Sequence, residues 1–172
     1  MRLFVAIRPP PEVVDALAAL PRPEAKPVRW TRPDQWHVTL RFFGNVDDAA
    51  PITSALTGAL RDVAPLPVTI GPRAGLLGRQ VVYVPVTGLT DIASTLVEAT
   101  KAFGDPPSTR RFRGHLTLAR MKGGFVDLAS LALEGSWTVR DIELIRSHLG
   151  RGGARYETVE RFELRAQAAS SL

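Results

Sequence analysis

A four-residue pattern occurs twice in this chain and constrains the fold more than any other feature. Residues 37–40 read His-Val-Thr-Leu and residues 115–118 read His-Leu-Thr-Leu. Two of the three histidines open such a run, which chance would produce in on the order of one in several thousand chains of this composition. Alternate side chains of a β-strand share a face, so each copy would present His and Thr together and its two apolar residues to a core. The sequence therefore predicts two matched strands that line one cleft from opposite sides.

Strand-like and helix-like segments alternate along the rest of the chain. Strands are expected at 3–8, 36–43, 66–70, 81–86, 113–121, 136–149 and 155–165, and helices at 10–20, 47–63 and 90–103, with a short helical turn over 126–133. Asp47 is a candidate cap for the second helix, and residues 151–154 a hairpin turn between the last two strands. This mixture indicates an α+β domain with helices packed on antiparallel sheets.

Length and composition limit the remaining possibilities. A chain of 172 residues suits one domain spanning 1–172, with residues 166–172 expected to fray. No apolar run could span a bilayer and no secretory signal opens the chain. The absence of cysteine excludes disulfides and thiol chemistry and favours a cytoplasmic location. A formal charge of +5 favours a polyanion such as RNA, although a GC-rich genome would produce the same arginine excess.

The duplicated His-x-Thr pair suits phosphodiester chemistry. One imidazole in such a strand is more often structural, but two matched copies favour a catalytic cleft. An imidazole titrates near neutral pH, so one of the pair can accept a proton while the other donates one. Two threonine hydroxyls, Thr39 and Thr117, can donate hydrogen bonds to the non-bridging oxygens as negative charge develops.

The sequence speaks against ATP and metal chemistry. None of the three lysines, Lys26, Lys101 and Lys122, follows a glycine, so no phosphate-binding Gly-Lys loop is present. A metal site would have to combine His37 and His115 with scattered acidic residues. We therefore expect neither a cofactor nor a metal.

The residues around both motifs resemble the two-histidine (2H) phosphoesterase superfamily, and in particular its bacterial and archaeal RNA 2′,3′-cyclic phosphodiesterases, also called 2′-5′ RNA ligases. The matching segments are residues 2–7, 37–44, 115–120, 144–156 (with Ser147, Leu149 and Tyr156) and 162–164, which together span nearly the whole chain. The resemblance implies a bilobal, pseudo-symmetric fold with antiparallel sheets lining a central cleft and helices outside. It implies no metal, with His37 as general acid on the 3′-oxygen and His115 as general base on water. Gly114, where proline is common, and His148 depart from the family pattern.

Other candidate substrate contacts follow from alternation or from the resemblance. Alternation places Arg41 and Phe43 on the face of His37, where Arg41 could hold phosphate or face solvent and Phe43 could flank a base, although core packing is favoured for Phe43. The resemblance gives Arg120 a base-stacking role, which strict alternation opposes unless a bulge or strand end intervenes. The basic residues at 110–113 could attract RNA or form a solvated loop.

The sequence thus predicts a metal-independent enzyme that opens 2′,3′-cyclic phosphate ends of RNA to 2′-phosphates, with ATP-independent 2′-5′ joining as a side reaction. Its expected partner is RNA with such an end, tRNA halves among the candidates, and it is expected to act as a monomer without membrane contact. Two alternatives stay open. One is a cyclic phosphodiesterase for a small nucleotide such as ADP-ribose 1″,2″-cyclic phosphate, and the other is a non-catalytic module that binds RNA ends.

Overall fold

The computed structural model describes residues 1–22 and 27–165. The elements are β1 (Arg2–Ile7), α1 (Pro11–Ala18), β2 (Val28–Trp30), the short 3₁₀ helix η1 (Pro33–Gln35), β3 (Val38–Asn45), α2 (Ala50–Leu60), β4 (Leu66–Ile70), β5 (Gly75–Leu77), β6 (Val81–Thr87), α3 (Thr90–Thr100), β7 (His115–Met121), the 3₁₀ helix η2 (Leu128–Ser130), β8 (Gly135–Val139), β9 (Asp141–Gly150) and β10 (Gly153–Glu163).

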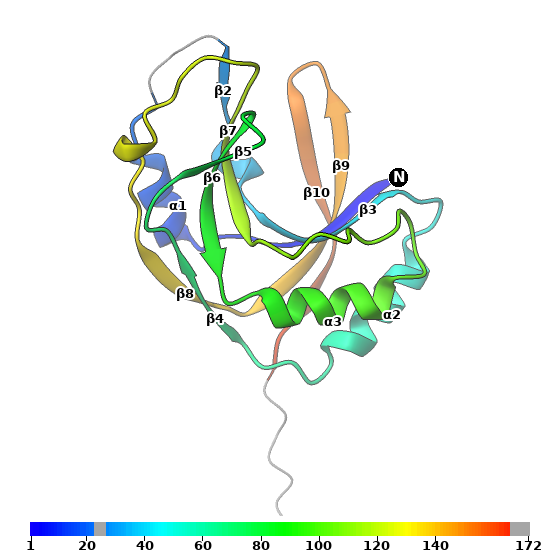
Figure 1. Cartoon of the computed structure of the whole chain (residues 1–172). Coiled ribbons are helices and arrows are strands. Elements are labelled where there is room, and N and C mark those ends of the chain that lie inside the picture. The colour runs from blue at the N-terminus through cyan, green and yellow to red at the C-terminus, as the bar shows by residue number, and fades with distance from the viewer. Residues whose placement is uncertain (23–26, 166–172) are drawn as a thin grey trace, which may run out of the picture.

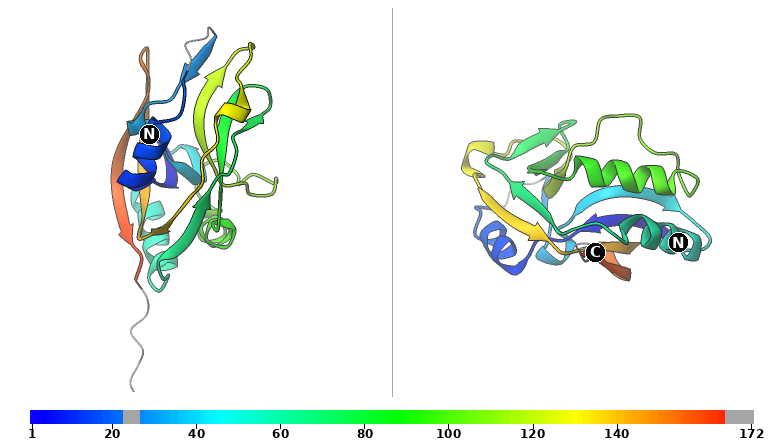
Figure 2. Two further views of the ribbon diagram at one scale, coloured as in Figure 1. Left: turned by 90° about the vertical axis from the view of Figure 1, so that its left-hand side faces the viewer. Right: turned by 90° about the horizontal axis from the view of Figure 1, so that it is seen from below.

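All strand pairs are antiparallel and join in the order β10-β9-β1-β3-β7-β6-β4-β8, with β2 added beside β7 and β5 beside β6. The sheet curls, so that the β9–β10 hairpin rises on one side and β6 and β7 on the other (Figures 1 and 2). Helices α2 and α3 lie side by side below it in Figure 1, where α3 contacts β3 and α2 contacts β10. The predicted α+β fold with antiparallel sheet is confirmed.

The two halves of the sheet repeat one arrangement. In the first half β1 leads through α1 and β2 to β3, and β3 pairs with β1. In the second half β6 leads through α3 to β7, and β7 pairs with β6. The two motif strands, β3 and β7, meet at the pair Val38 and Leu116. The fold therefore brings the two His-x-Thr segments, far apart in the sequence, next to each other.

Both motif strands carry a β-bulge directly after the threonine. Thr39 lies opposite Ala6 and Arg41 lies opposite Val5, so Leu40 has no partner on β1. In the second half Thr117 lies opposite Tyr83 and Ala119 opposite Val82, which leaves Leu118 as the extra residue. A bulge adds one residue to a strand and resets the alternation of its side chains.

Apolar side chains at helical spacing pack the helices against the core of the protein. Helix α1 buries Val13 and Leu17, and α3 buries Ile92 and Leu96. These pairs are four residues apart and therefore lie on one face of each helix. They join a single core with the apolar residues of the strands, and this core holds the motif strands in place.

The structure corrects several sequence-based boundaries. The expected strand over 136–149 is two strands, because β8 pairs with β4 whereas β9 pairs with β1 and β10. Strand β5 lies in the segment 71–80, for which the sequence predicts only turns. Asp47 does not cap α2; Asp48 instead accepts a hydrogen bond from the Ala50 N–H at 3.0 Å.

Two expectations about the whole chain stay predictions. The segment 166–172, expected to fray, lies outside the described residues. The assignment of residues 1–172 to a single domain is likewise untested. Within the described ranges, no helix has the length and apolar character needed to cross a membrane.

Candidate active site

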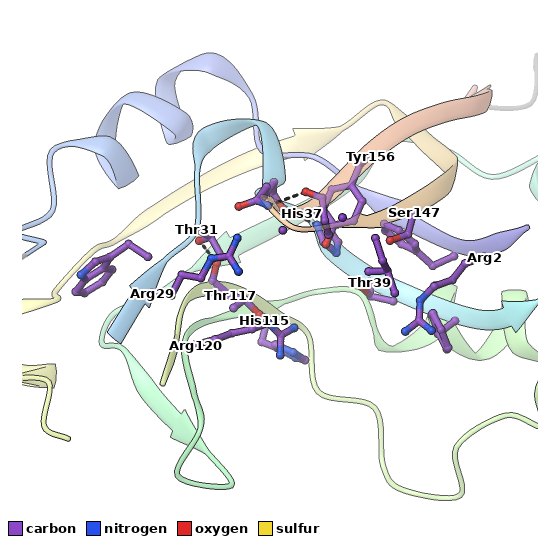
Figure 3. A pocket seen from close by; sticks show the side chains of 18 residues that line it. Arg2, Arg29, Thr31, His37, Thr39, His115, Thr117, Arg120, Ser147 and Tyr156 are labelled. Carbon is purple, nitrogen blue, oxygen red and sulfur yellow. Dashed lines mark hydrogen bonds between the residues drawn. The ribbon is translucent and has the colours of Figure 1, made fainter. Parts of the chain in front are cut away.

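A cavity of about 570 Å³ lies between the two motif strands. Both histidines and both threonines of the repeated pattern line it, as does Arg120 (Figure 3). The other lining residues come from β1, β2, the segment before β3, β3 itself and the β9–β10 hairpin: Arg2, Phe4, Arg29, Trp30, Thr31, Gln35, Phe42, Ser147, Leu149, Gly150, Gly153, Ala154 and Tyr156. The predicted cleft between the two motifs is therefore present.

A backbone carbonyl two residues earlier fixes the first histidine. His37 Nδ1 lies 2.7 Å from the carbonyl oxygen of Gln35. A carbonyl can only accept, so Nδ1 carries the proton and Nε2 is left to exchange protons. Gln35 is itself tied to the β9–β10 hairpin, because its side-chain amide donates to the Ala154 carbonyl at 2.8 Å.

A buried carboxylate holds the segment that carries His37. Glu143, on β9, is 2 % exposed and accepts hydrogen bonds from Arg8, Thr158 and Arg161 at 3.0, 2.9 and 2.8 Å. Burial alone would raise its pKa, but these donors, Arg8 first, lower it. Arg8 also donates to the Asp34 carbonyl at 3.2 Å, and so connects β9 to the turn that leads to His37.

The second histidine is held in the same way. His115 Nδ1 lies 2.8 Å from the carbonyl oxygen of Arg113, again two residues earlier. Gly114, between them, packs against β6: a Cβ there would lie 2.3 Å from the Val86 carbonyl oxygen. The Val86 N–H donates to the Gly114 carbonyl at 2.9 Å. Glycine thus lets the chain approach β6 closely just before the motif.

Hydrogen bonds also connect the first motif to the second. The indole N–H of Trp36, the residue before His37, donates to Thr31 Oγ1 at 2.9 Å. The Thr31 hydroxyl in turn lies 2.8 Å from the carbonyl oxygens of Thr117 and Leu118, to either of which it can donate. These hydrogen bonds, together with the pairing of Val38 and Leu116, therefore fix the position of the two motifs relative to each other.

The cavity is electropositive. Three arginines, Arg2, Arg29 and Arg120, line it, and none of the described lining residues carries a carboxylate. Burial lowers the pKa of His37 to about 4, helped by the positive charges of Arg8 and Arg120 and by His115. His37 is therefore neutral at pH 7 in the free protein, and the cavity suits an anionic ligand.

The structure contradicts the cavity-facing positions that alternation gives Arg41 and Phe43, and confirms the core packing favoured for Phe43. The bulge at Leu40 turns Arg41 into the protein, where it is 5 % exposed and donates to the carbonyls of Phe42, Phe103 and Asp105. A second register shift leaves Phe43 unpaired and fully buried in the core. Neither residue lines the cavity. Phe42 lines it instead and is 36 % exposed.

A β-bulge also directs Arg120 into the cavity. The bulge at Leu118 makes Leu118 and Ala119 both buried, so Arg120 returns to the face of Thr117. Strict alternation would turn Arg120 away from the cavity, and this bulge removes that conflict. Its stacking on a base stays a prediction, as do the roles of the histidines and threonines.

Two further sequence features lie outside the cavity. His148 pairs with Glu157, their Nε2 and Oε2 atoms 2.7 Å apart, on the β9–β10 hairpin. The basic segment 110–113 precedes β7 and contributes no lining residue. Among the residues that the structure describes, no group of three His, Asp or Glu side chains is placed to hold a metal ion.

Sequence reasoning gave no site role to several residues that shape the cavity. The rings of Phe4 and Tyr156 lie 4.9 and 5.0 Å from the His37 ring, centroid to centroid, and Arg2 and Phe42 line the same cavity. One signal could have found Phe42. It stands five residues after His37, as Arg120 stands five residues after His115.

Comparisons with known proteins found one matching family and several similar folds. Residues 7–151 match the model of the 2′-5′ RNA ligase superfamily. The chain is 28 % identical to the RNA 2′,3′-cyclic phosphodiesterase of Escherichia coli (strain K12), with 95 % of this chain and 96 % of that protein covered. The crystal structure of TT0787 of Thermus thermophilus is similar, with a TM-score of 0.86, 28 % identity and coverage of 98 % and 100 %. So is that of E. coli LigT complexed with 3′-AMP, with a TM-score of 0.76, 28 % identity and coverage of 95 % and 97 %.

Proposed function

Because the chain belongs to the 2′-5′ RNA ligase superfamily, we propose that it hydrolyses 2′,3′-cyclic phosphate ends of RNA and leaves a 2′-phosphate. The observation that carries the proposal is the pairing of two identically held His-x-Thr segments across one electropositive cavity. The name of the E. coli relative, an RNA 2′,3′-cyclic phosphodiesterase, supports the reaction class. The 3′-AMP in the LigT complex supports a nucleotide as ligand.

The antiparallel register supports one His and one Thr on each side of a bound phosphate. Val38 lies opposite Leu116, and continuing this register sets His115 beside Thr39 and His37 beside Thr117. In-line displacement needs the attacking and leaving oxygens on opposite sides of phosphorus. A base and an acid at the two ends of the phosphate meet that need.

The proposed reaction uses these groups in one step. His115 Nε2 takes a proton from water, the water oxygen bonds to phosphorus, and the bond from phosphorus to the 3′-oxygen breaks. His37 Nε2 gives its proton to the departing 3′-oxygen, so the phosphate stays on the 2′-oxygen. The Thr39 and Thr117 hydroxyls donate to the non-bridging oxygens, and Arg120, at the His37 end, stacks on the base.

The acid role requires His37 to gain a proton when substrate binds. In the free protein its pKa is about 4, because the ring is partly buried and desolvated. A phosphodiester anion placed against the ring favours the charged imidazolium. The substrate thus supplies the charge that makes His37 an acid in the complex.

End-group analysis tests the proposal. The protein, treated with EDTA, is incubated with an oligonucleotide that ends in a 2′,3′-cyclic phosphate, and the product is identified by phosphorus NMR. We expect a 2′-phosphate, formed far more slowly by the His37→Ala variant. A 3′-phosphate would overturn the acid and base assignment, and a requirement for added divalent metal would overturn the mechanism. Binding without turnover would make the protein a module for RNA ends.

A further inference from the structure

The cavity has a second planar cation at the end opposite Arg120. The guanidinium of Arg2, on β1, lies over the ring of Phe42 with 4.6 Å between its carbon and the ring centroid. Both residues line the cavity, and Figure 3 shows Arg2 beside Thr39 and Ser147, away from Arg29 and Arg120. The proposed reaction uses neither Arg2 nor Phe42.

The bulges explain why these groups lie at opposite ends. Phe42 stands three residues after Thr39, and Arg120 three residues after Thr117, on strands that run in opposite directions. Because of the bulges, each lies two register steps, or roughly 7 Å, along its strand from its threonine. By the register, Arg120 lies beyond His37 and Phe42 lies beyond His115. The Arg2–Phe42 pair is therefore on the side from which the nucleophile would approach.

The pair is built to hold a flat, electron-rich ring. The Phe42 ring holds the guanidinium over it by a cation–π contact, so a ligand ring can meet the guanidinium from the side away from Phe42. Nucleobases stack on guanidinium planes and aromatic rings with little dependence on sequence. A water nucleophile needs no such surface, whereas a ribose 5′-hydroxyl brings a base with it.

We infer that Arg2 and Phe42 form a stacking platform for the nucleoside that carries a 5′-hydroxyl. The inference rests on the proposed function. In joining, the 5′-oxygen bonds to phosphorus and its proton passes to His115, while the bond to the 3′-oxygen breaks and that oxygen takes the proton of His37. Opening of a 2′-5′ bond is the same step reversed, so the platform then holds the departing nucleoside. The energy comes from the cyclic ester, and no ATP takes part.

Equilibrium binding tests the platform, with chromatography after each titration to check that the ligand is intact. Titration calorimetry measures the Kd of 2′-AMP, which has one base, and of 2′-5′-linked ApA, which has two, for the wild type, Phe42→Ala and Arg2→Gln. We expect ApA to bind about 5- to 100-fold more weakly to both variants, the usual effect of losing one stacked base, and 2′-AMP to bind as before. Arg2→Gln leaves the Phe42 ring in place, so the test survives if Phe42→Ala fails to fold.

Two matched variants serve as controls. Phe125→Ala removes a ring that is 81 % exposed and does not line the cavity, and Arg61→Gln removes a charge at the exposed end of α2. Both should bind ApA like the wild type. Equal weakening of ApA and 2′-AMP in the platform variants, no weakening of ApA, or no binding of ApA to the wild type would each overturn the platform.

Hydrolysis of an oligonucleotide that ends in a 2′,3′-cyclic phosphate is measured in parallel to separate the two proposals. A wild type that does not hydrolyse it overturns the proposed function, whatever the binding results. A wild type that hydrolyses it but binds ApA no better than Phe42→Ala does overturns the platform alone.

Discussion

The two halves of the cleft hold their histidines by the same means. Each histidine donates from Nδ1 to the carbonyl two residues earlier, at 2.7 Å for His37 and 2.8 Å for His115. Each lies on a strand that bulges directly after its threonine. The repeated sequence pattern thus encodes a repeated local geometry, which leaves Nε2 of each ring for the substrate.

The surroundings of the two rings differ. His37 packs against the rings of Phe4 and Tyr156, which also contact each other, and burial lowers its pKa to about 4. His115 meets the edge of Tyr83 at 5.7 Å, and its hydrogen bond to Arg113 is exposed to solvent. Burial favours the neutral form of His37, so the acid role proposed for it depends on the bound phosphodiester anion.

Removing either imidazole should have the largest effect on catalysis. We expect His37→Ala and His115→Ala each to lower kcat by about 10²–10⁴-fold, and the double variant to lose little more, because both groups act in one transition state. Steady-state kinetics on a 2′,3′-cyclic-phosphate oligonucleotide measures this. His148→Ala is the matched control, since His148 pairs with Glu157 outside the cavity. Near-full activity in either folded single variant would contradict the paired scheme.

The burial of His37 should also appear in stability. Its folded-state pKa of about 4 lies below the unfolded value near 6.5, so between these pH values only the unfolded chain takes up the proton. The free energy of unfolding should therefore fall by up to about 3 kcal/mol as the pH drops from 6.5 to 4.

Urea unfolding at several pH values checks this expectation. His37→Gln should lose that part of the slope, because glutamine does not titrate. His115→Gln, in the other half, is the matched comparison. An unchanged slope in His37→Gln, or the same change in both variants, would show that burial of His37 is not the cause.

The sequence predicted the repeat, the α+β fold and the meeting of the two motifs, because those depend on alternation and on apolar patterns. It could not predict which side chains follow the threonines into the cleft. Strict alternation directs Arg41 and Phe43 there, but the bulge at Leu40 directs Phe42 there instead. Pairing between distant strands decides a bulge, and the sequence of one strand does not show it. Only the base-stacking role expected of Arg120, which requires its side chain to face the cavity, indicated a bulge.

The residue after each bulge gives the sharpest remaining contrast between the halves. It is Arg41 in the first half and Ala119 in the second, and both are buried. Arg41 donates to the carbonyls of Phe42, Asp105 and Phe103 at 2.6, 2.7 and 3.1 Å, and so fastens the segment after α3 to β3. Arg41→Met, which keeps the aliphatic stem, should lower the free energy of unfolding by about 1–3 kcal/mol, because three part-buried carbonyls lose their charged donor. Urea unfolding measures that loss, and kcat on the cyclic-phosphate substrate should stay unchanged because Arg41 does not reach the cavity. A large fall in kcat with unchanged stability would contradict this prediction and support the phosphate-binding role that strict alternation predicts for Arg41.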